Sequence, residues 1–311
     1  MRLVFAGTPD AAVPTLRRLA AEHEIAAVVT RPDAPLGRKR VHTPSPVAAA
    51  ADELGLAVIK AARLDDEVTE RIVALGADLG VIVAYGGLVR EPLLSTPTHG
   101  WINLHFSLLP RWRGAAPVQR ALIAGDDVIG ASVFQLVPAL DAGDVYATRT
   151  VVLPENATAD VALATLAADG AALTAEVVAD ISAGRARAVP QEGEVTFAPK
   201  LTLDDGLVDW RQPLADVYAR FRGVTPEPGA HTTVAGTRVK ILAAHPADAE
   251  RPADAGPMGP GVIAATKREV LIGTADAPLA VTRVQPAGKG AMNAVDWWRG
   301  IRSSDGLRAG S

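Results

Sequence analysis

Two polar residues with catalytic potential, Asn103 and His105, stand in an otherwise apolar run at residues 101–105. The run has the length and composition of a β-strand, in which alternate residues share a face, so the two side chains project the same way, roughly 7 Å apart. A histidine can carry a proton near neutral pH, and an asparagine amide can donate a hydrogen bond to an oxyanion. The pair therefore fits acyl or formyl transfer to an amine, and a histidine that is merely satisfied at a strand end fits the same pattern.

A second candidate is the acidic turn at residues 140–144, which contains Asp141 and falls between two expected strands. Aspartate and glycine are common turn residues, so the motif by itself requires no function. If the sheet brings the turn beside Asn103 and His105, its carboxylate would orient the imidazole or hold a water molecule.

Length and composition exclude several classes of protein. The 311 residues are enough for two domains or one large one, and 49% apolar with 21% charged residues is typical of a globular chain. There is no run of about 18 consecutive apolar residues, and the apolar start is too short for a signal peptide, so we expect a cytoplasmic protein without a membrane span. The absence of cysteine excludes disulfides, zinc–thiolate sites and cysteine nucleophiles.

The first half of the chain alternates runs of strand length with stretches of helical spacing. We expect strands at residues 3–6, 25–30, 57–59, 79–84, 101–105, 131–136 and 147–152, and helices at residues 11–21, 46–54, 66–75, 116–124 and 160–182. This alternation predicts an α/β fold with a doubly wound, mostly parallel sheet, in which ligands bind at the carboxyl ends of the strands. The turn after the first strand, at residues 7–10, lacks the glycine spacing of dinucleotide and nucleoside-triphosphate fingerprints.

The pattern changes at residue 185. Residues 185–206 are rich in Pro, Gly and Asp and lack periodicity, which predicts a linker between a catalytic domain at 1–184 and a second domain at 207–311. Short alternating runs in the second domain predict a small β-barrel or sandwich. Residues 1–205 carry 18 Lys and Arg against 25 Asp and Glu, whereas residues 206–311 carry 13 against 10, so the C-terminal part is the basic one.

Residues 103–117, followed 36 positions after His105 by Asp141, closely resemble the formyltransferases that use 10-formyltetrahydrofolate. The resemblance continues in both halves of the chain, at residues 7–9, 196–200, 209–210 and 285–292. It implies a Rossmann-like catalytic domain followed by an OB-like β-barrel, and no metal.

The same resemblance implies roles for individual residues. Asn103 would polarise the formyl oxygen, His105 would stabilise the tetrahedral intermediate and help to move protons, and Asp141 would orient or charge-balance His105. The folate would contact Val83, Tyr85, Gly86, Leu88, Ser107, Leu108, Leu109 and Pro110.

Residues 31–46 form a basic segment with four positive charges against one negative, broken by prolines and a glycine that keep it out of the sheet. Such a cluster suits phosphates, although a charged run is often only a solvated loop. The segment is also similar to the inserted loop with which tRNA-formylating members of the family bind the acceptor arm of initiator tRNA, where Arg38 takes the place of the chief basic residue. We therefore expect tRNA contacts from Arg38, Lys39 and Arg40 in the loop, and from Arg238, Lys240, Lys289 and Arg283 in the barrel.

The resemblance implies an enzyme that transfers a formyl group from 10-formyltetrahydrofolate to the α-amino group of methionyl initiator tRNA. The sequence shows no obvious helical zipper, so we expect a monomer. An alternative acceptor is a small amine such as glycinamide ribonucleotide or an amino-sugar nucleotide, which would require neither the basic loop nor the basic barrel. A non-catalytic RNA-binding protein on the same fold would tolerate loss of Asn103, His105 and Asp141. Residues 84–90 and 224–230 depart from the family pattern, in the folate pocket wall and at a bend of the C-terminal domain.

Overall fold

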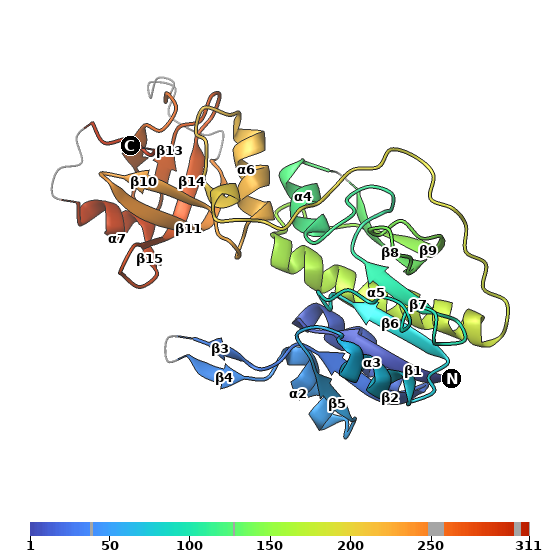
Figure 1. Ribbon diagram of the computed structural model, residues 1–311. Helices are drawn as coiled ribbons and strands as arrows, with labels where there is room; N and C mark the ends of the chain where they lie inside the picture. The colour runs from blue at the N-terminus through green and yellow to red at the C-terminus, as the bar shows by residue number, and fades with distance from the viewer. Residues whose placement is uncertain (38–39, 127, 248–257, 302–305, 311) are drawn as a thin grey trace. The chain divides into compact units, whose positions relative to one another are not determined.

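The computed structural model describes residues 1–37, 40–126, 128–247, 258–301 and 306–310 (Figure 1). Contacts divide the chain into two compact units. Unit 1 comprises residues 1–117, 128–152 and 163–199, and unit 2 comprises residues 118–127, 153–162 and 200–311. The segment expected as a linker therefore lies within unit 1 as far as residue 199, and the boundaries expected at residues 184 and 206 stay a prediction.

Unit 1 is built on a seven-stranded sheet in the order β5-β2-β1-β6-β7-β8-β9. Its strands are β1 (Arg2–Gly7), β2 (Glu24–Thr30), β5 (Val58–Lys60), β6 (Leu79–Val83), β7 (Trp101–His105), β8 (Ile129–Gln135) and β9 (Val145–Val151). The first five strands of the order run parallel, and β8 and β9 are antiparallel to their neighbours. All five residues of β6 are buried, as expected for a central strand of a sheet covered on both faces. The doubly wound, mostly parallel sheet is confirmed.

Five helices lie between these strands or follow them, and two of them begin at side-chain caps. They are η1 (Asp10–Ala12), α1 (Val13–Ala20), α2 (Pro46–Glu53), α3 (Asp66–Val73) and α5 (Ala159–Ser182), whose first turn falls in unit 2. The side chains of Ser45 and Asp65 accept hydrogen bonds from the amides three residues on, at the starts of α2 and α3. These two caps fix where the helices begin and therefore where the preceding loops end.

Helix α5 is long and apolar enough to span a membrane by length and composition, and 56% of its most apolar window is buried inside the protein. Its Gly170 packs against Leu104 of β7, and a Cβ at this position would lie 2.8 Å from Leu104 Cδ2. The glycine thus lets α5 approach the strand that carries Asn103 and His105. The buried fraction of α5 is in keeping with a helix in the core of the protein.

The basic loop expected at residues 31–46 contains a hairpin that the sequence did not predict. Strands β3 (Ala34–Leu36) and β4 (Val41–Thr43) pair antiparallel, with Leu36 opposite Val41, and stay apart from the seven-stranded sheet (Figure 1). Arg40 follows the turn and is exposed, whereas Arg38 and Lys39 lie outside the described residues. The hairpin thus places Arg40 outside the main sheet.

Unit 2 contains an antiparallel sheet in the order β10-β11-β14-β13-β12, with β15 paired to β14. Its elements are α4 (Pro117–Ile123, from Val118 onward), η2 (Asp204–Gly206), α6 (Leu214–Gly223), β10 (His231–Val234), β11 (Thr237–Pro246), β12 (Ile263–Ala265), β13 (Val270–Ile272), β14 (Leu279–Pro286), β15 (Met292–Asn293) and α7 (Ala294–Arg299). The strand order ends at β10 and β12, and isolated bridges join Ala309 to Val234 of β10 and Arg308 to Val262, the residue before β12, which agrees with the expected barrel-type domain.

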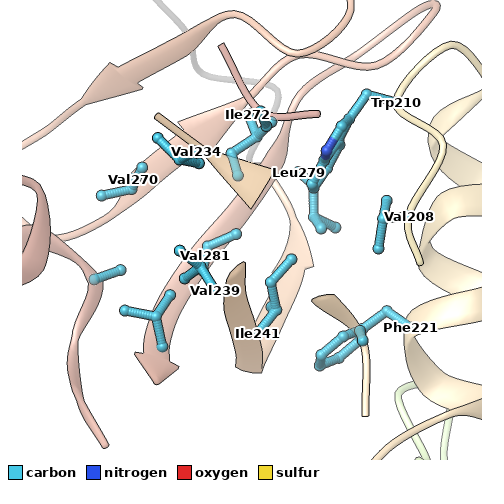
Figure 2. Packing of buried hydrophobic residues seen from close by; sticks show 14 of the residues in the cluster. Val208, Trp210, Phe221, Val234, Val239, Ile241, Val270, Ile272, Leu279 and Val281 are labelled. Atoms are coloured by element: carbon cyan, nitrogen blue, oxygen red, sulfur yellow. The ribbon is translucent and has the colours of Figure 1, made fainter. Parts of the chain in front are cut away.

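Apolar side chains from the strands, α6 and α7 form the core of unit 2 (Figure 2). Val239, Ile241 and Val281 come from neighbouring strands and are at most 2% exposed, and Phe221 of α6 packs against them. Trp210 closes the cluster, and its indole N–H donates to Thr232 Oγ1 over 2.9 Å, so its polar atom is satisfied within the core. Alternation along β11 places Val239 inside and leaves Arg238 at the surface.

Candidate functional site

A cavity of about 750 Å³ lies beside the carboxyl ends of β6 and β7 in unit 1. Asn103, His105 and Asp141 all line it, although Asp141 is far from the other two in sequence. The antiparallel pairing of β7 with β8 explains this, because the turn that contains Asp141 follows β8. The fold therefore brings together the three residues predicted to do chemistry, at the sheet edge where α/β proteins bind ligands.

The imidazole of His105 is held in one tautomer. Its Nε2 lies 2.8 Å from the carbonyl oxygen of Trp112, and because a carbonyl can only accept, Nε2 carries the proton and donates it. Trp112 adopts a left-handed conformation with φ of 62°, a rare state for a residue with a side chain. In the neutral ring, Nδ1 is consequently the nitrogen able to accept a proton.

Asp141 faces that nitrogen. Its Oδ2 lies 3.8 Å from His105 Nδ1 and accepts a hydrogen bond of 2.8 Å from the amide of Gly114. The side chains of His105 and Asp141 are 7% and 12% exposed, so both are largely shielded from solvent. Burial lowers the pKa of His105 below its usual value, while the charge of Asp141 and the carbonyl of Trp112 act in the opposite direction. The site therefore keeps His105 neutral at rest and gives the imidazolium a partner when Nδ1 takes up a proton.

Asn103 lines the cavity beside His105. Its Oδ1 is buried and has no hydrogen-bond partner in the part of the chain that the structure describes. A buried acceptor without a partner is uncommon, and such atoms often mark a site that is completed by a ligand. The Nδ2 group is the donor that Asn103 has available for a reacting oxygen.

The cavity wall contains three of the eight residues expected to contact folate, namely Tyr85, Gly86 and Leu88. Tyr85 is buried and donates its hydroxyl to the carbonyl of Ala61 over 3.2 Å, and burial raises the pKa of this phenol. Leu88 is 69% exposed, so its side chain is available at the wall. This part of the expected binding surface lies in the segment at residues 84–90 that departs from the family pattern.

The other five expected folate residues, Val83, Ser107, Leu108, Leu109 and Pro110, do not line the cavity. Val83 is buried within the sheet, and Leu108 packs against Gly130 of β8. Ser132 of β8 ties down the loop by donating to the carbonyl of Ser107 over 2.7 Å and accepting from the amide of Leu109 over 3.2 Å. In the structure Ser107, Leu108 and Leu109 thus fasten the loop that follows β7 to β8.

A segment that sequence reasoning treated as a linker contributes to the site. Residues 189–199, called the strap below, pair with Val145 at one end and with Arg113 near the other, through the isolated bridges Val145–Val189 and Arg113–Phe197. Phe197 and Arg113 both line the cavity. The motif at residues 196–200 was a signal for this part of the strap, whereas no motif drew attention to the residues before it.

The strap also holds the loop that carries Trp112. Thr196 accepts hydrogen bonds of 2.9 Å from the amides of Trp112 and Arg113, through Oγ1 and its carbonyl respectively. Gly114 has φ of 125°, and a Cβ there would lie 2.7 Å from the carbonyl of Ala198. The close approach of the strap thus requires a glycine beside Asp141 and fixes the carbonyl that selects the tautomer of His105.

The cavity as a whole suits an organic ligand with a largely apolar surface. Tyr85, Leu88, Leu140 and Phe197 provide apolar wall, and the polar groups are concentrated at one place, around His105. A mostly apolar cleft with a few convergent polar groups is typical of small-molecule and cofactor sites of this size.

A second candidate surface lies in unit 2, and we call it the β11 hollow. Arg238 and Lys240 share a face of β11 and line a hollow of about 270 Å³ together with His231 and Gln285. Neither cation has an ion pair with a described acidic residue. Lys289 lies in the turn after β14, where its carbonyl accepts from Gln285 Nε2 over 3.1 Å, so the structure brings three of the predicted tRNA-binding residues into one neighbourhood. Arg283, further along β14, pairs with Ala243 and Asn293 and does not line the hollow.

Comparisons with known proteins agree with this architecture. The model of the formyl transferase family matches residues 1–178, and that of the formyl transferase C-terminal domain matches residues 200–302. Methionyl-tRNA formyltransferase of Clavibacter sepedonicus is 61% identical over 306 residues, which cover 98% of this chain and 99% of that protein. The enzyme of the same name from Leifsonia xyli subsp. xyli is 58% identical over 300 residues, which cover 96% of this chain and 97% of that protein.

Among solved structures, methionyl-tRNA formyltransferase from Clostridium thermocellum shares the fold, with a TM-score of 0.57 and 14% identity over 79% of this chain and 93% of that one. Two family models cover both units, and the relatives at 61% and 58% identity extend over nearly the whole chain. The chain therefore belongs to the formyl transferase family, and within it to the methionyl-tRNA formyltransferases.

Proposed function

We propose that this enzyme transfers the formyl group of 10-formyltetrahydrofolate to the α-amino group of methionyl initiator tRNA. The observation that carries the proposal is the joint placement of Asn103, His105 and Asp141 around one cavity, in a chain that is 61% identical to a methionyl-tRNA formyltransferase over nearly its whole length. The cavity volume of about 750 Å³ and the apolar wall fit a folate-sized ligand. The folate supplies the formyl group, and its N10 is the leaving nitrogen.

The residues of the chain act on the proton and on the developing charge. As the free amine attacks the formyl carbon, Asn103 Nδ2 donates to the formyl oxygen and stabilises the negative charge that develops on it. His105 Nδ1 accepts the proton that the amine loses, and Asp141 stabilises the resulting imidazolium. The same proton then passes from His105 to the departing nitrogen, so that charge and protons balance over the reaction.

The basic groups of the chain support a tRNA acceptor. Arg40 at the hairpin turn, with Arg38 and Lys39 beside it in the sequence, and Arg238, Lys240 and Lys289 around the β11 hollow would contact backbone phosphates. Binding depends on local potential, so a chain with a net charge of −4 can still hold a polyanion. We further propose that the enzyme acts as a monomer in the cytoplasm and without a membrane.

The experiment that tests the proposal measures transfer of radiolabelled formyl from 10-formyltetrahydrofolate to methionyl initiator tRNA, with glycinamide ribonucleotide and an amino-sugar nucleotide as competing acceptors. Label on the tRNA that disappears in His105→Ala supports both the reaction and the acceptor. Label on a small amine alone would overturn the tRNA acceptor, and label on none of the acceptors would overturn formyl transfer.

A further inference from the structure

We propose that Gln191, a residue of the strap, is a positioning residue for formyl transfer, which holds the turn of Asp141 so that its carboxylate faces Nδ1 of His105. The inference rests on the proposed function of the cavity. Gln191 does not line the cavity, and no motif of the sequence marked it. Its place in the reaction follows from its hydrogen bonds to two loops that do line the cavity.

The amide of Gln191 is fully used between these loops. Its Nε2 donates to the carbonyl oxygens of Asp141 and Gly143, each over 2.8 Å. Its Oε1 accepts from Nε and Nη2 of Arg113, over 3.2 and 2.7 Å. The side chain thus ties the turn after β8 to the loop after β7, which also carries the amide of Gly114 that binds the carboxylate of Asp141.

A side-chain amide is required at this position. The two carbonyls can only accept, and the guanidinium of Arg113 can only donate, so the bridging group must donate twice and accept twice. Glutamate accepts from the arginine but cannot donate to the carbonyls, and lysine or arginine cannot accept. Asparagine carries the same group on a side chain that is one methylene shorter.

The turn needs this support because of its backbone. Asp141 has a left-handed φ of 44°, a conformation that a residue with a side chain keeps when the surrounding structure holds it. At its far end the turn is bound to β8 through the amide of Gln135 and the carbonyl of Asp144, 2.8 Å apart. Gln191 holds the backbone of the turn at Asp141 itself, and without it the amide of Gly114 is left to keep the carboxylate facing His105.

The test is a double-mutant cycle in the full-length enzyme, with Gln191→Ala, Asp141→Asn and the double variant. We expect Gln191→Ala to lower kcat about tenfold or more, because small displacements of catalytic groups are costly, and to leave KM for tRNA within about twofold. In the Asp141→Asn background the same substitution should have almost no further effect on kcat, since the charge that Gln191 positions is already gone. A role in folding alone predicts equal losses in both backgrounds and would overturn the proposal.

Two further variants keep the test decisive. Gln191→Glu retains acceptance from Arg113 and loses both donations to the turn, so it should reproduce the kcat loss, and it replaces Gln191→Ala in the cycle if that variant does not fold. Glu192→Ala is the matched control, because Glu192 is the exposed neighbour on the same strap and has no hydrogen bond or ion pair with a described residue. A loss of kcat in Glu192→Ala equal to that of Gln191→Ala would contradict a specific role for Gln191.

A readout without substrate separates this inference from the proposed function. In the unliganded enzyme, an NMR titration of the His105 ring should shift to lower pH in Gln191→Ala, in the same direction as in Asp141→Asn. If the wild-type enzyme formylates a different amine, the double-mutant cycle is run with that amine as the acceptor. The expected shift of the His105 titration is the same, because the titration is measured without substrate. An unshifted titration in both Gln191 variants would overturn the positioning role whichever acceptor is used.

Discussion

The carbonyl oxygen of Trp112 and Nε2 of His105 lie 2.8 Å apart, and this contact decides which nitrogen of the imidazole can take part in proton transfer. The left-handed backbone at Trp112 aims the carbonyl at the ring, and Thr196 holds the amide of the same residue. With Nε2 committed as a donor, Nδ1 is the proton acceptor, and Asp141 is the charge that meets it. In the proposed reaction, acid–base chemistry therefore falls on one defined atom, Nδ1 of His105.

The ionisation of His105 is the first prediction. Burial lowers its pKa below the ordinary value of 6.5, so the ring is neutral at pH 7 and is protonated only in more acidic solution. Since Asp141 raises the pKa of His105, Asp141→Asn should lower it further. The measurement is an NMR titration of labelled histidine, in which His105→Gln identifies the resonance among the six histidines.

The pH dependence of kcat should follow the same ionisation of His105. Proton uptake at Nδ1 requires the neutral ring, so kcat should fall on the acid side with an apparent pKa below 6.5. In Asp141→Asn the acid limb should move to still lower pH while the maximal rate also drops. An acid limb above 6.5 in the wild-type enzyme would contradict the role given to His105.

Removal of the amide at Asn103 is the second prediction. Asn103→Ala deletes the donor to the developing oxyanion and should lower kcat by roughly 10²- to 10³-fold, with a smaller change in KM. Because Asn103 Oδ1 has no partner among the described residues, its loss breaks no hydrogen bond to that atom, and the melting temperature should stay close to that of the wild type. Steady-state kinetics and thermal unfolding check the two parts. A loss confined to KM would place Asn103 in binding rather than in catalysis.

Gly143 provides the third prediction. A Cβ at this buried position would collide with the carbonyl oxygen of Gln135, so Gly143→Ala must displace the turn that carries Asp141. We expect a loss of stability of about 1–3 kcal/mol from overpacking, together with a drop in kcat. Gly290→Ala is the control, since a methyl group added there would have no described atom within 4 Å, and it should change stability by less than about 0.5 kcal/mol. Full activity in Gly143→Ala would show that the turn can move without harm.

Local pattern was sufficient to predict the elements that carry the central residues. The run at residues 101–105 became β7 with the predicted bounds, because its clear periodicity directly follows a break at Gly100. Alternation along β7 also placed Asn103 and His105 on the cavity. The hairpin of β3 and β4 was not predicted, because two three-residue strands with a proline in one of them carry too little periodicity to detect.

The supports of the site could not be predicted from the sequence. The strap has the composition of a linker, and it is ordered by backbone pairing with Arg113 and Val145, residues that are 84 and 44 positions away from their partners. Gln191 makes all four of its hydrogen bonds to residues at least 48 positions away, and no local pattern contains such information. In this chain the residues proposed to act on substrate have a sequence signature, and those proposed to position them depend on the fold.

The basic β11 hollow gives the last prediction. Arg238 and Lys240 share the outward face of β11, so Arg238→Ala and Lys240→Ala should each raise KM for methionyl initiator tRNA several-fold and leave kcat at saturating tRNA unchanged. A plot of the logarithm of the binding constant against the logarithm of the salt concentration has a negative slope, and each lost phosphate contact should make this slope less steep by about 0.9. Binding measured between low and physiological salt checks this, with the exposed Lys267, which lies outside the hollow, as the Lys267→Ala control. Equal salt dependence of tRNA binding in all three variants and the wild type would show that the hollow is not part of the tRNA-binding surface. A weaker salt dependence in Arg238→Ala and Lys240→Ala alone would locate backbone phosphates on β11.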